Sequence, residues 1–242
     1  MPKSPPTVLC PGPWRPGEVV RVAGAELRHA RARRLAVGDP VRVLDTTGRL
    51  AGGVVSGLGR GFMEVEIETQ ADAAAAGPSV ILLAPALRLP RLSWLVEKAT
   101  ELNVSEIRIT GSSRSQGSRA RGVDTHRLER VAMSAMKQCG RTDWPRCAGI
   151  VAWEDALRTP GQHRWLLDPS GESFPASLVP SPSVVWIGPE GGFSPAEVSA
   201  AASAGWRVVG LPGATLRAET AAVVALALLA AAFDRASPRG GK

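Results

Sequence analysis

One strand-turn-helix segment constrains the fold of this 242-residue chain more than any other. Val184 to Ile187 is apolar at every position, a pattern typical of a strand that is buried on both faces. The glycine-rich stretch Gly188 to Phe193 follows. Ser194 and Glu197 then have the spacing of a capping box, and Pro195 suits the first helical position. A glycine-rich turn between a strand and a helix lets the backbone approach a ligand closely, because no Cβ stands in the way.

Apolar runs alternate with helical patterns from residue 80 onward. The predicted strands are Val80–Ala84, Ile107–Ile109, Trp165–Leu167, Val184–Ile187 and Val208–Leu211. The predicted helices are Leu92–Leu102, Thr125–Cys139, Pro195–Ala204 and Glu219–Phe233. This alternation predicts a parallel α/β sheet, which binds ligands beyond the carboxyl ends of its strands. The last helix is apolar nearly all round, which favours burial partly by a second subunit and so a homodimer.

The first seventy residues have a different rhythm. The predicted strands there are Val19–Val22, Val41–Leu44, Ala51–Val55 and Met63–Ile67, with one helix from Ala25 to Leu35. Short strands at this spacing predict a small barrel or sandwich, and Gly57 to Gly61 is predicted as a hairpin turn. The Ala-rich stretch Gln70 to Ser79 is typical of a linker. We therefore expect one domain at residues 1–72 and a second at residues 73–242.

The chain carries a formal net charge of +7, mostly from arginine. Such a balance favours an anionic partner, and nucleic acid is the first candidate. Arg28, Arg31, Arg33 and Arg34 cluster in the N-terminal part, and on a helix Arg28 and Arg31 share a face that can contact adjacent phosphates. A solvated charged face is the alternative for each of these side chains.

Several other kinds of site are excluded by their missing motifs. Cys10, Cys139 and Cys147 form neither an even disulfide set nor a metal-ligand spacing, so we expect reduced thiols and no metal. No phosphate loop, dinucleotide fingerprint or nucleophilic serine turn is present. Residues 1–16 lack the apolar core of a signal peptide, and Ala221 to Phe233 is too short to span a bilayer. These features predict a cytoplasmic protein that does not bind a membrane.

Four segments carry a resemblance to a known family. Gly188 to Glu197 and Leu216 to Ala221 look like the paired cofactor loops of knotted (SPOUT-type) RNA methyltransferases. Glu97 to Leu102 and Gln138 to Arg141 resemble the 16S ribosomal RNA uridine-N3 methyltransferase family. Asn103 stands where that family usually has glycine, an exchange that is tolerated because Asn accepts the left-handed conformation. The resemblance implies an α/β, trefoil-knotted methyltransferase domain with a parallel sheet, preceded by a small PUA-like β-barrel.

The resemblance also implies a cofactor and a reaction. It suggests that S-adenosylmethionine donates a methyl group to N3 of a uridine in the 16S ribosomal RNA of the small ribosomal subunit. The implied cofactor-binding residues are Leu167, Gly188, Pro189, Glu190, Gly191, Leu211, Leu216, Arg217, Ala218 and Thr220. Arg217 is expected to stabilise negative charge on the uracil oxygens, and Glu219 to accept the N3 proton. Stabilisation of the N-terminus of the last helix is the alternative for Glu219.

RNA contacts are expected from both parts of the chain. The residues in question are Arg28, Arg31, Arg33, Arg34, Lys98, Arg114 and Arg141. Ion pairing with Glu97 or Glu101 is the alternative for Lys98, and surface solvation is the alternative for Arg114 and Arg141. Two other functions stay open at this point. One is a knotted methyltransferase that modifies a ribose 2′-hydroxyl or transfer RNA, and the other is a noncatalytic RNA-binding assembly factor.

Overall fold

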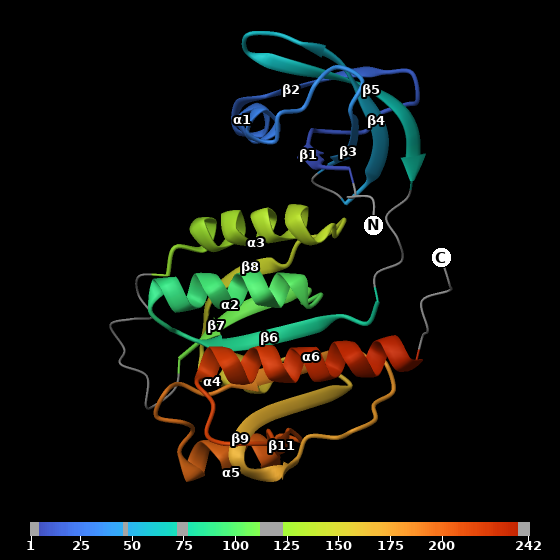
Figure 1. Cartoon of the computed structure of the whole chain (residues 1–242). Helices are drawn as coiled ribbons and strands as arrows, with labels where there is room; N and C mark the ends of the chain where they lie inside the picture. The colour runs from blue at the N-terminus through green and yellow to red at the C-terminus, as the bar shows by residue number, and fades with distance from the viewer. Residues whose placement is uncertain (1–4, 46–47, 72–76, 112–122, 237–242) are drawn as a thin grey trace. The chain divides into compact units, whose positions relative to one another are not determined.

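The structure is a computed structural model that describes residues 5–45, 48–71, 77–111 and 123–236. Contacts divide the chain into two compact units, residues Met1–Ala76 with Met136–Asp143, and residues Gly77–Ala135 with Trp144–Lys242. Each unit is built around its own sheet (Figure 1). The predicted domain boundary at residues 72–73 lies outside the described residues.

The N-terminal unit contains a five-stranded sheet and one helix. Its elements are β1 (Thr7–Leu9), β2 (Val19–Ala23), α1 (Gly24–Ala32), β3 (Pro40–Leu44), β4 (Leu50–Leu58) and β5 (Phe62–Ala71). The strand order is β1-β3-β4-β5-β2, antiparallel except for the β1–β3 pair. The predicted hairpin turn is confirmed, because the N–H of Gly59 donates to the carbonyl of Phe62 at 2.9 Å. Alternate strand residues such as Val41, Val43 and Val65 form the core.

The observed elements of this unit differ from the predicted ones in two details. The three-residue strand β1 was not predicted, since a run this short carries too little periodicity to be recognised. Strand β5 continues to Ala71, so the first residues of the expected linker belong to the strand. Pairing of Ala51 with Gln70 and of Leu50 with Ala71 extends the strand that far.

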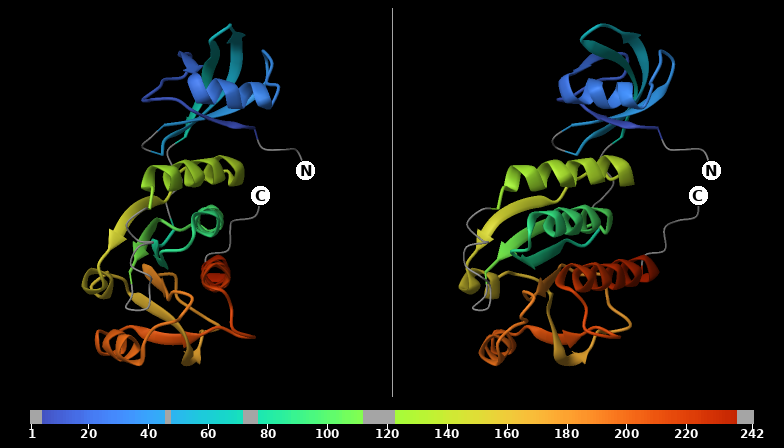
Figure 2. Two further views of the ribbon diagram at one scale, coloured as in Figure 1. Left: turned by 90° about the vertical axis from the view of Figure 1, so that its left-hand side faces the viewer. Right: turned by 60° about the vertical axis from the view of Figure 1, so that its left-hand side comes forward.

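The C-terminal unit is a six-stranded sheet with helices on both faces (Figure 2). Its strands are β6 (Val80–Pro85), β7 (Glu106–Thr110), β8 (Arg146–Val151), β9 (His163–Ser173), β10 (Ser183–Ile187) and β11 (Arg207–Gly210). Its helices are α2 (Leu89–Glu101), α3 (Thr125–Cys139, whose last residues fall in the other unit), α4 (Trp153–Leu157), α5 (Pro195–Ser203) and α6 (Ala218–Ala236). The strand order is β11-β9-β10-β6-β7-β8, and every pair is parallel. The predicted parallel sheet is therefore confirmed.

The two faces of this sheet have separate cores. Leu82, Val185 and Ile187 pack on one face with residues of α2, α3 and α6. Leu83 and Trp186 pack on the other face with residues of α4 and α5. Because neighbouring residues of one strand point to opposite faces, a strand covered on both sides is apolar at successive positions, as β10 is from Val184 to Ile187.

Most of the predicted elements of this unit are confirmed, and α3 has its predicted bounds. Asn103 adopts the left-handed conformation, with a φ of 61°. Strand β8 and the short helix α4 were missed. Strand β8 is an edge strand that pairs only with β7, and several of its residues are exposed, so it lacks the apolar run of the central strands. None of the described helices is long and apolar enough to cross a membrane.

Candidate functional site

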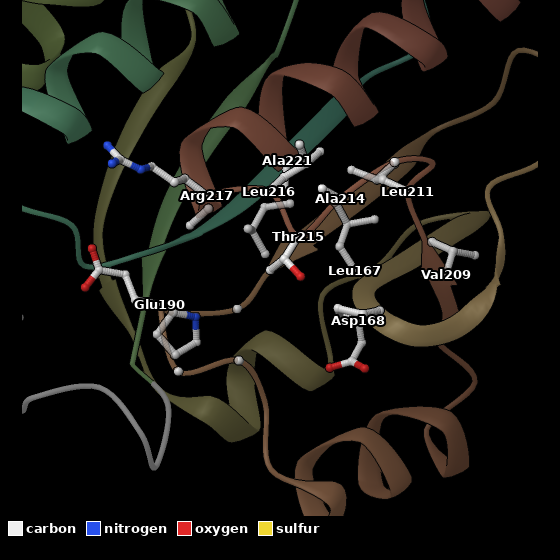
Figure 3. Close-up of a pocket in the computed structure, with 18 of the residues that line it drawn as sticks. Leu167, Asp168, Glu190, Val209, Leu211, Ala214, Thr215, Leu216, Arg217 and Ala221 are labelled. Carbon is white, nitrogen blue, oxygen red and sulfur yellow. The ribbon is translucent and has the colours of Figure 1, made fainter.

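A cavity of about 930 Å³ lies beyond the carboxyl ends of β10 and β11 and beside the middle of β9. Residues 167–169, 187–192 and 213–218 form most of its wall, together with the start of α2 (Figure 3). The two segments singled out in the sequence therefore meet at one cavity. Every expected cofactor-binding residue lines it except Thr220, which is exposed in the first turn of α6.

We call the segment from Gly188 to Phe193 the glycine loop. Glycine is required at two of its positions, for a different physical reason at each. A Cβ on Gly188 would lie 3.1 Å from two ring carbons of Phe193, so only glycine lets that ring pack against the backbone without displacement. Gly192 has a φ of +68°, in the left-handed region that favours glycine. The N–H of Gly192 donates to the carbonyl of Pro189 at 2.9 Å, which closes the turn.

The end of the glycine loop packs against the protein core and leads into a capped helix. Phe193 is 5% exposed, and its ring centroid lies 5.6 Å from that of Trp186 and 6.1 Å from that of Trp153. The predicted capping box is confirmed, since Glu197 N–H donates to Ser194 Oγ at 3.2 Å and Ser194 N–H donates to the Glu197 carboxylate at 2.7 Å. Aromatic packing and the helix start therefore fix this wall before any ligand binds.

The second loop, Leu211 to Arg217, which we call the rim loop, is more exposed. Its middle, residues 212–215, is exposed at every position, and Gly213 adopts a φ of +99°. Leu211 and Leu216 are half-buried and line the cavity with Leu167, which comes from the middle of β9 (Figure 3). These leucines give the cavity apolar walls that suit a flat ring.

Three charged side chains meet beside the cavity. The Arg91 guanidinium donates from Nε to Glu219 Oε1 at 2.8 Å and from Nη2 to Glu219 Oε2. Its Nη1 donates to Glu190 Oε1. Arg91 therefore connects α2 to the glycine loop and to the start of α6 at once.

The pKa of the Glu219 carboxyl is lowered, chiefly because Arg91 hydrogen-bonds to it, and Arg217 adds electrostatic attraction for the charged form. The strands β6 and β10, which pack against α6, contain no titratable side chain. On α2, Glu97, Lys98 and Glu101 lie in the later turns and pair with one another. Arg91, with its second partner Glu190, and Arg217 thus dominate the electrostatics of Glu219.

Two further arginines line the cavity without such partners. Arg217 and Arg88 are exposed, and neither forms an ion pair or a side-chain hydrogen bond within the part of the chain that the structure describes. In Figure 3 the side chain of Arg217 lies on the same side of the cavity as Glu190, and Asp168 lies on the opposite side. One guanidinium of the site is thus held by carboxylates, while two remain available to a ligand.

Asp168 was not predicted as a site residue. It follows Leu167 at the cavity wall, and its Oδ1 accepts hydrogen bonds from the N–H of Ser170 at 2.9 Å and from Ser170 Oγ at 2.6 Å. These bonds orient the carboxylate, which can accept from ligand hydroxyl or ammonium groups. Within the described ranges, no three His, Cys, Asp or Glu side chains are grouped in a way that could hold a metal ion.

Sequence reasoning also missed Arg88 and Arg91. The signal that could have identified all three residues is position. Asp168 directly follows the stretch of β9 that pairs with β10, and the two arginines follow the carboxyl end of β6. None belongs to a glycine-rich motif, so motif reading passed over them.

The arginine cluster of the N-terminal unit is exposed, as a phosphate-binding face requires. Arg28, Arg31, Arg33 and Arg34 are all exposed on or just after α1. Arg31 Nη2 also donates to the carbonyl of Gly59 at 2.9 Å and to that of Arg60 at 2.7 Å, so this side chain also braces the β4–β5 hairpin. RNA binding by the cluster stays a prediction.

The remaining expected RNA contacts are engaged or lie outside the described residues. Lys98 Nζ donates to Glu97 at 2.7 Å and to Glu101 at 2.8 Å, the arrangement that the structural alternative predicts. These carboxylates raise the pKa of Lys98. Arg141 pairs with Asp143, with Nη2 2.7 Å from Oδ2. Arg114 lies outside the described residues.

Comparison with known proteins agrees with this geometry. The sequence profile of the RNA methyltransferase domain family matches residues 75–230, which include every segment that lines the cavity. The ribosomal RNA small subunit methyltransferases E of Mycobacterium bovis and Mycobacterium tuberculosis are each 27% identical over 225 residues. That match covers 87% of this chain and 85% of each of those proteins.

A solved structure has the same fold. The ribosomal RNA small subunit methyltransferase E from Neisseria gonorrhoeae, crystallised with S-adenosyl methionine, is 23% identical and superposes with a TM-score of 0.81. The superposition covers 95% of this chain and 98% of that chain. The arrangement of elements around the cavity is therefore shared over nearly the full length of both chains.

Proposed function

The chain belongs to the RNA methyltransferase domain family, and from this premise we propose that it transfers a methyl group from S-adenosylmethionine to N3 of a uridine in 16S ribosomal RNA. The observation that carries the proposal is the meeting of the glycine loop and the rim loop at one cavity beyond the sheet. The names of the mycobacterial and Neisseria relatives support the choice of small-subunit ribosomal RNA. The N3 position rests on the resemblance of residues 97–102 and 138–141.

The residues of the cavity fit S-adenosylmethionine. Leu167, Leu211 and Leu216 give apolar surface for the adenine ring, and the Asp168 carboxylate can accept hydrogen bonds from the ribose hydroxyls. The backbone of Gly188 and Gly191 lines the cavity and can approach the ligand because no side chain intervenes. When bound, the cofactor supplies an electrophilic methyl group.

The chain's own residues have distinct parts in the proposed reaction. Uracil N3 must lose its proton to form the new N–C bond, and the negative charge then spreads to the neighbouring oxygens. Arg217, exposed at the rim, can stabilise that charge. Glu219, predicted as the proton acceptor, is buried and hydrogen-bonded by Arg91, which lowers its pKa, so its alternative role in stabilising the α6 N-terminus is the better supported one. The walls of the cavity contribute the remaining rate acceleration by aligning uracil N3 with the methyl group.

The proposal includes the finer features that the resemblance implies. Residues 73–242 would form a trefoil knot in which the glycine loop and the rim loop take part, and residues 1–72 would form a PUA-like barrel that presents the arginine cluster to RNA. A homodimer is supported by the apolar side chains that α2 and α6 leave uncovered, such as Trp94 at 43% exposed and the half-buried Val223. The ribosomal substrate would place the protein in the cytoplasm.

Mass spectrometry of ribosomal RNA nucleosides from a deletion strain tests the proposal. We expect 3-methyluridine to disappear from 16S ribosomal RNA and to return when the wild-type chain is expressed. Loss of a ribose-methylated or transfer-RNA nucleoside instead would indicate a methyltransferase with another target. Unchanged nucleosides, together with no heat of S-adenosylmethionine binding in calorimetry, would indicate a noncatalytic assembly factor.

A further inference from the structure

Arg91 breaks a local rule of helix design. Acidic side chains are favoured in the first turn of a helix, because the backbone dipoles leave partial positive charge there. The first turn of α2 contains no acid, and instead Arg88 precedes the helix and Arg91 lies in its first turn. Departures of this kind are expected where a site imposes its own requirement. Arg91 is therefore held in place by something other than its own helix.

The partners of Arg91 come from the glycine loop and from the start of α6, the helix that follows the rim loop. Glu219 belongs to the start of α6, directly after the rim loop, and Glu190 belongs to the glycine loop. The Nε–Oε1 and Nη2–Oε2 contacts with Glu219 form a two-pronged pair, the strongest geometry available to an arginine and a carboxylate. A single guanidinium thus ties both walls of the cavity to α2.

Burial separates the two contacts. The side chain of Glu219 is 11% exposed and that of Glu190 is 58% exposed. Removing the partner of a buried carboxylate is costly, whereas exposed ion pairs contribute little. We therefore expect the pair with Glu219 to carry most of the effect, and the pair with Glu190 to add a smaller one.

We propose that Arg91 is a positioning residue that holds the glycine loop and the start of α6 at the spacing at which the cavity binds S-adenosylmethionine. This inference rests on the proposed function and deepens it. Arg91 acts through the glycine loop and the start of α6. Arg217, which has no such partners among the described residues, is exposed at the rim and available to the proposed RNA substrate. Arg91 would therefore position the cofactor site, and Arg217 would contact the substrate.

Calorimetry on the full-length protein tests the inference, with S-adenosylmethionine and S-adenosylhomocysteine as ligands. We expect Arg91→Met and Glu219→Gln each to raise the Kd of both ligands about tenfold, the loss that follows from one charge-assisted hydrogen bond. The double variant should lose no more than about threefold beyond either single variant, because both changes remove the same contact. Glu190→Gln should raise Kd only about twofold. Arg158→Ala is the matched control, since Arg158 is an exposed arginine directly after α4 that pairs only weakly with Asp155 at 3.8 Å.

Two further readouts separate positioning from a general loss of structure. Arg91→Lys keeps the charge but not the planar fork, so we expect it to recover only part of the affinity. In methylation assays Arg91→Met should raise KM for S-adenosylmethionine about tenfold, while kcat at saturating cofactor stays within about threefold. Because S-adenosylhomocysteine lacks the sulfonium charge, equal losses for both ligands point to position rather than to charge.

The inference is overturned if Arg91→Met binds both ligands within twofold of wild type, or if the effects of Arg91→Met and Glu219→Gln multiply in the double variant. It is also overturned if Arg91→Met weakens the binding of S-adenosylhomocysteine but not that of S-adenosylmethionine. That result would show that the carboxylates of Glu190 and Glu219, no longer paired with Arg91, attract the sulfonium of S-adenosylmethionine. Wild-type protein that binds neither ligand would remove the proposed function, and this inference with it. Wild-type binding with an unaffected Arg91→Met would remove the inference alone.

Discussion

The two loops that enclose the cavity are built in opposite ways. The glycine loop ends in Phe193, which packs against Trp153 and Trp186, and it leads straight into a capped helix. The rim loop has no comparable support, since residues 212–215 are exposed throughout. One wall of the site is thus part of the protein core, and the other is a surface segment secured at its end, where α6 begins.

This difference indicates a division of labour. A wall that is packed into the core is already in place when the cofactor arrives, so little ordering entropy is lost there on binding. An exposed rim is open to a large substrate such as RNA, and it carries the exposed Arg217. We expect changes in the glycine loop to cost more stability than changes in the rim loop, and we expect replacement of Arg217 to affect turnover.

The largest effect should come from Phe193→Ala. Removing this buried ring leaves a void beside Trp186, so we expect the free energy of unfolding to fall by about 3–5 kcal/mol, measured by urea denaturation. Thr215→Ala, at an exposed position of the rim loop, is the control and should stay within about 0.5 kcal/mol of wild type. Similar losses in the two variants would contradict the contrast between the loops.

Arg217→Ala should separate turnover from binding. We expect kcat to fall about 100-fold, because a charge-stabilising donor is lost, while the Kd of S-adenosylmethionine changes by less than about twofold. Single-turnover methylation of 16S ribosomal RNA measures the first quantity and calorimetry the second. Arg207→Ala, an exposed arginine on β11, serves as the control. Normal single-turnover methylation by Arg217→Ala would refute the assignment of charge stabilisation to Arg217.

A smaller effect is expected from Gly213→Ala. Nothing lies within 4 Å of the position a Cβ would occupy there, so the cost is one of backbone conformation at a φ of +99°. We expect a loss of about 1 kcal/mol in the free energy of unfolding, and a smaller loss for Gly213→Asn, because Asn accepts positive φ more readily. Equal losses for Ala and Asn would show that packing, not backbone conformation, limits the rim loop.

The smallest effect concerns pH. The lowered pKa of Glu219 means that its ionised form stabilises the folded state, and this contribution is fully present above the unfolded-state pKa of about 4.3. It is lost as the pH falls further, through the lower pKa of the folded state. The difference in unfolding free energy between wild type and Glu219→Gln should therefore be constant above about pH 5.5 and shrink below about pH 4.3. A difference that grows on acidification would contradict the assigned direction.

Much of the fold could be predicted because its signals are local. The apolar run Val184 to Ile187, the capping box at Ser194 and the helix Thr125–Cys139 each follow from periodicity or spacing within a few residues. Strand β8 could not be predicted from the sequence, because an edge strand can be exposed and so need not contain a continuous apolar run. The order of the strands in the sheet could not be read from the sequence either, since it depends on pairings between segments far apart in the chain.

The candidate site shows the same limit. Motifs identified the glycine loop and the rim loop, and the structure brings both to one cavity. Arg91 and Asp168 belong to no motif, and they become site residues only because β6 and β9 lie on either side of β10 in the sheet.

The sequence by itself determined the parallel sheet, the two loops and the type of chemistry that they resemble, because these depend on local spacing and on which residues avoid water. Only the tertiary structure decided which charges meet. Arg91 and Glu219 are 128 residues apart in the chain, and Arg91 and Glu190 are 99 residues apart. No local preference selects such partners, since an ion pair forms where packing of the core happens to bring two side chains together. The sequence identified the two segments separately, and the structure showed that the Arg91 guanidinium connects them.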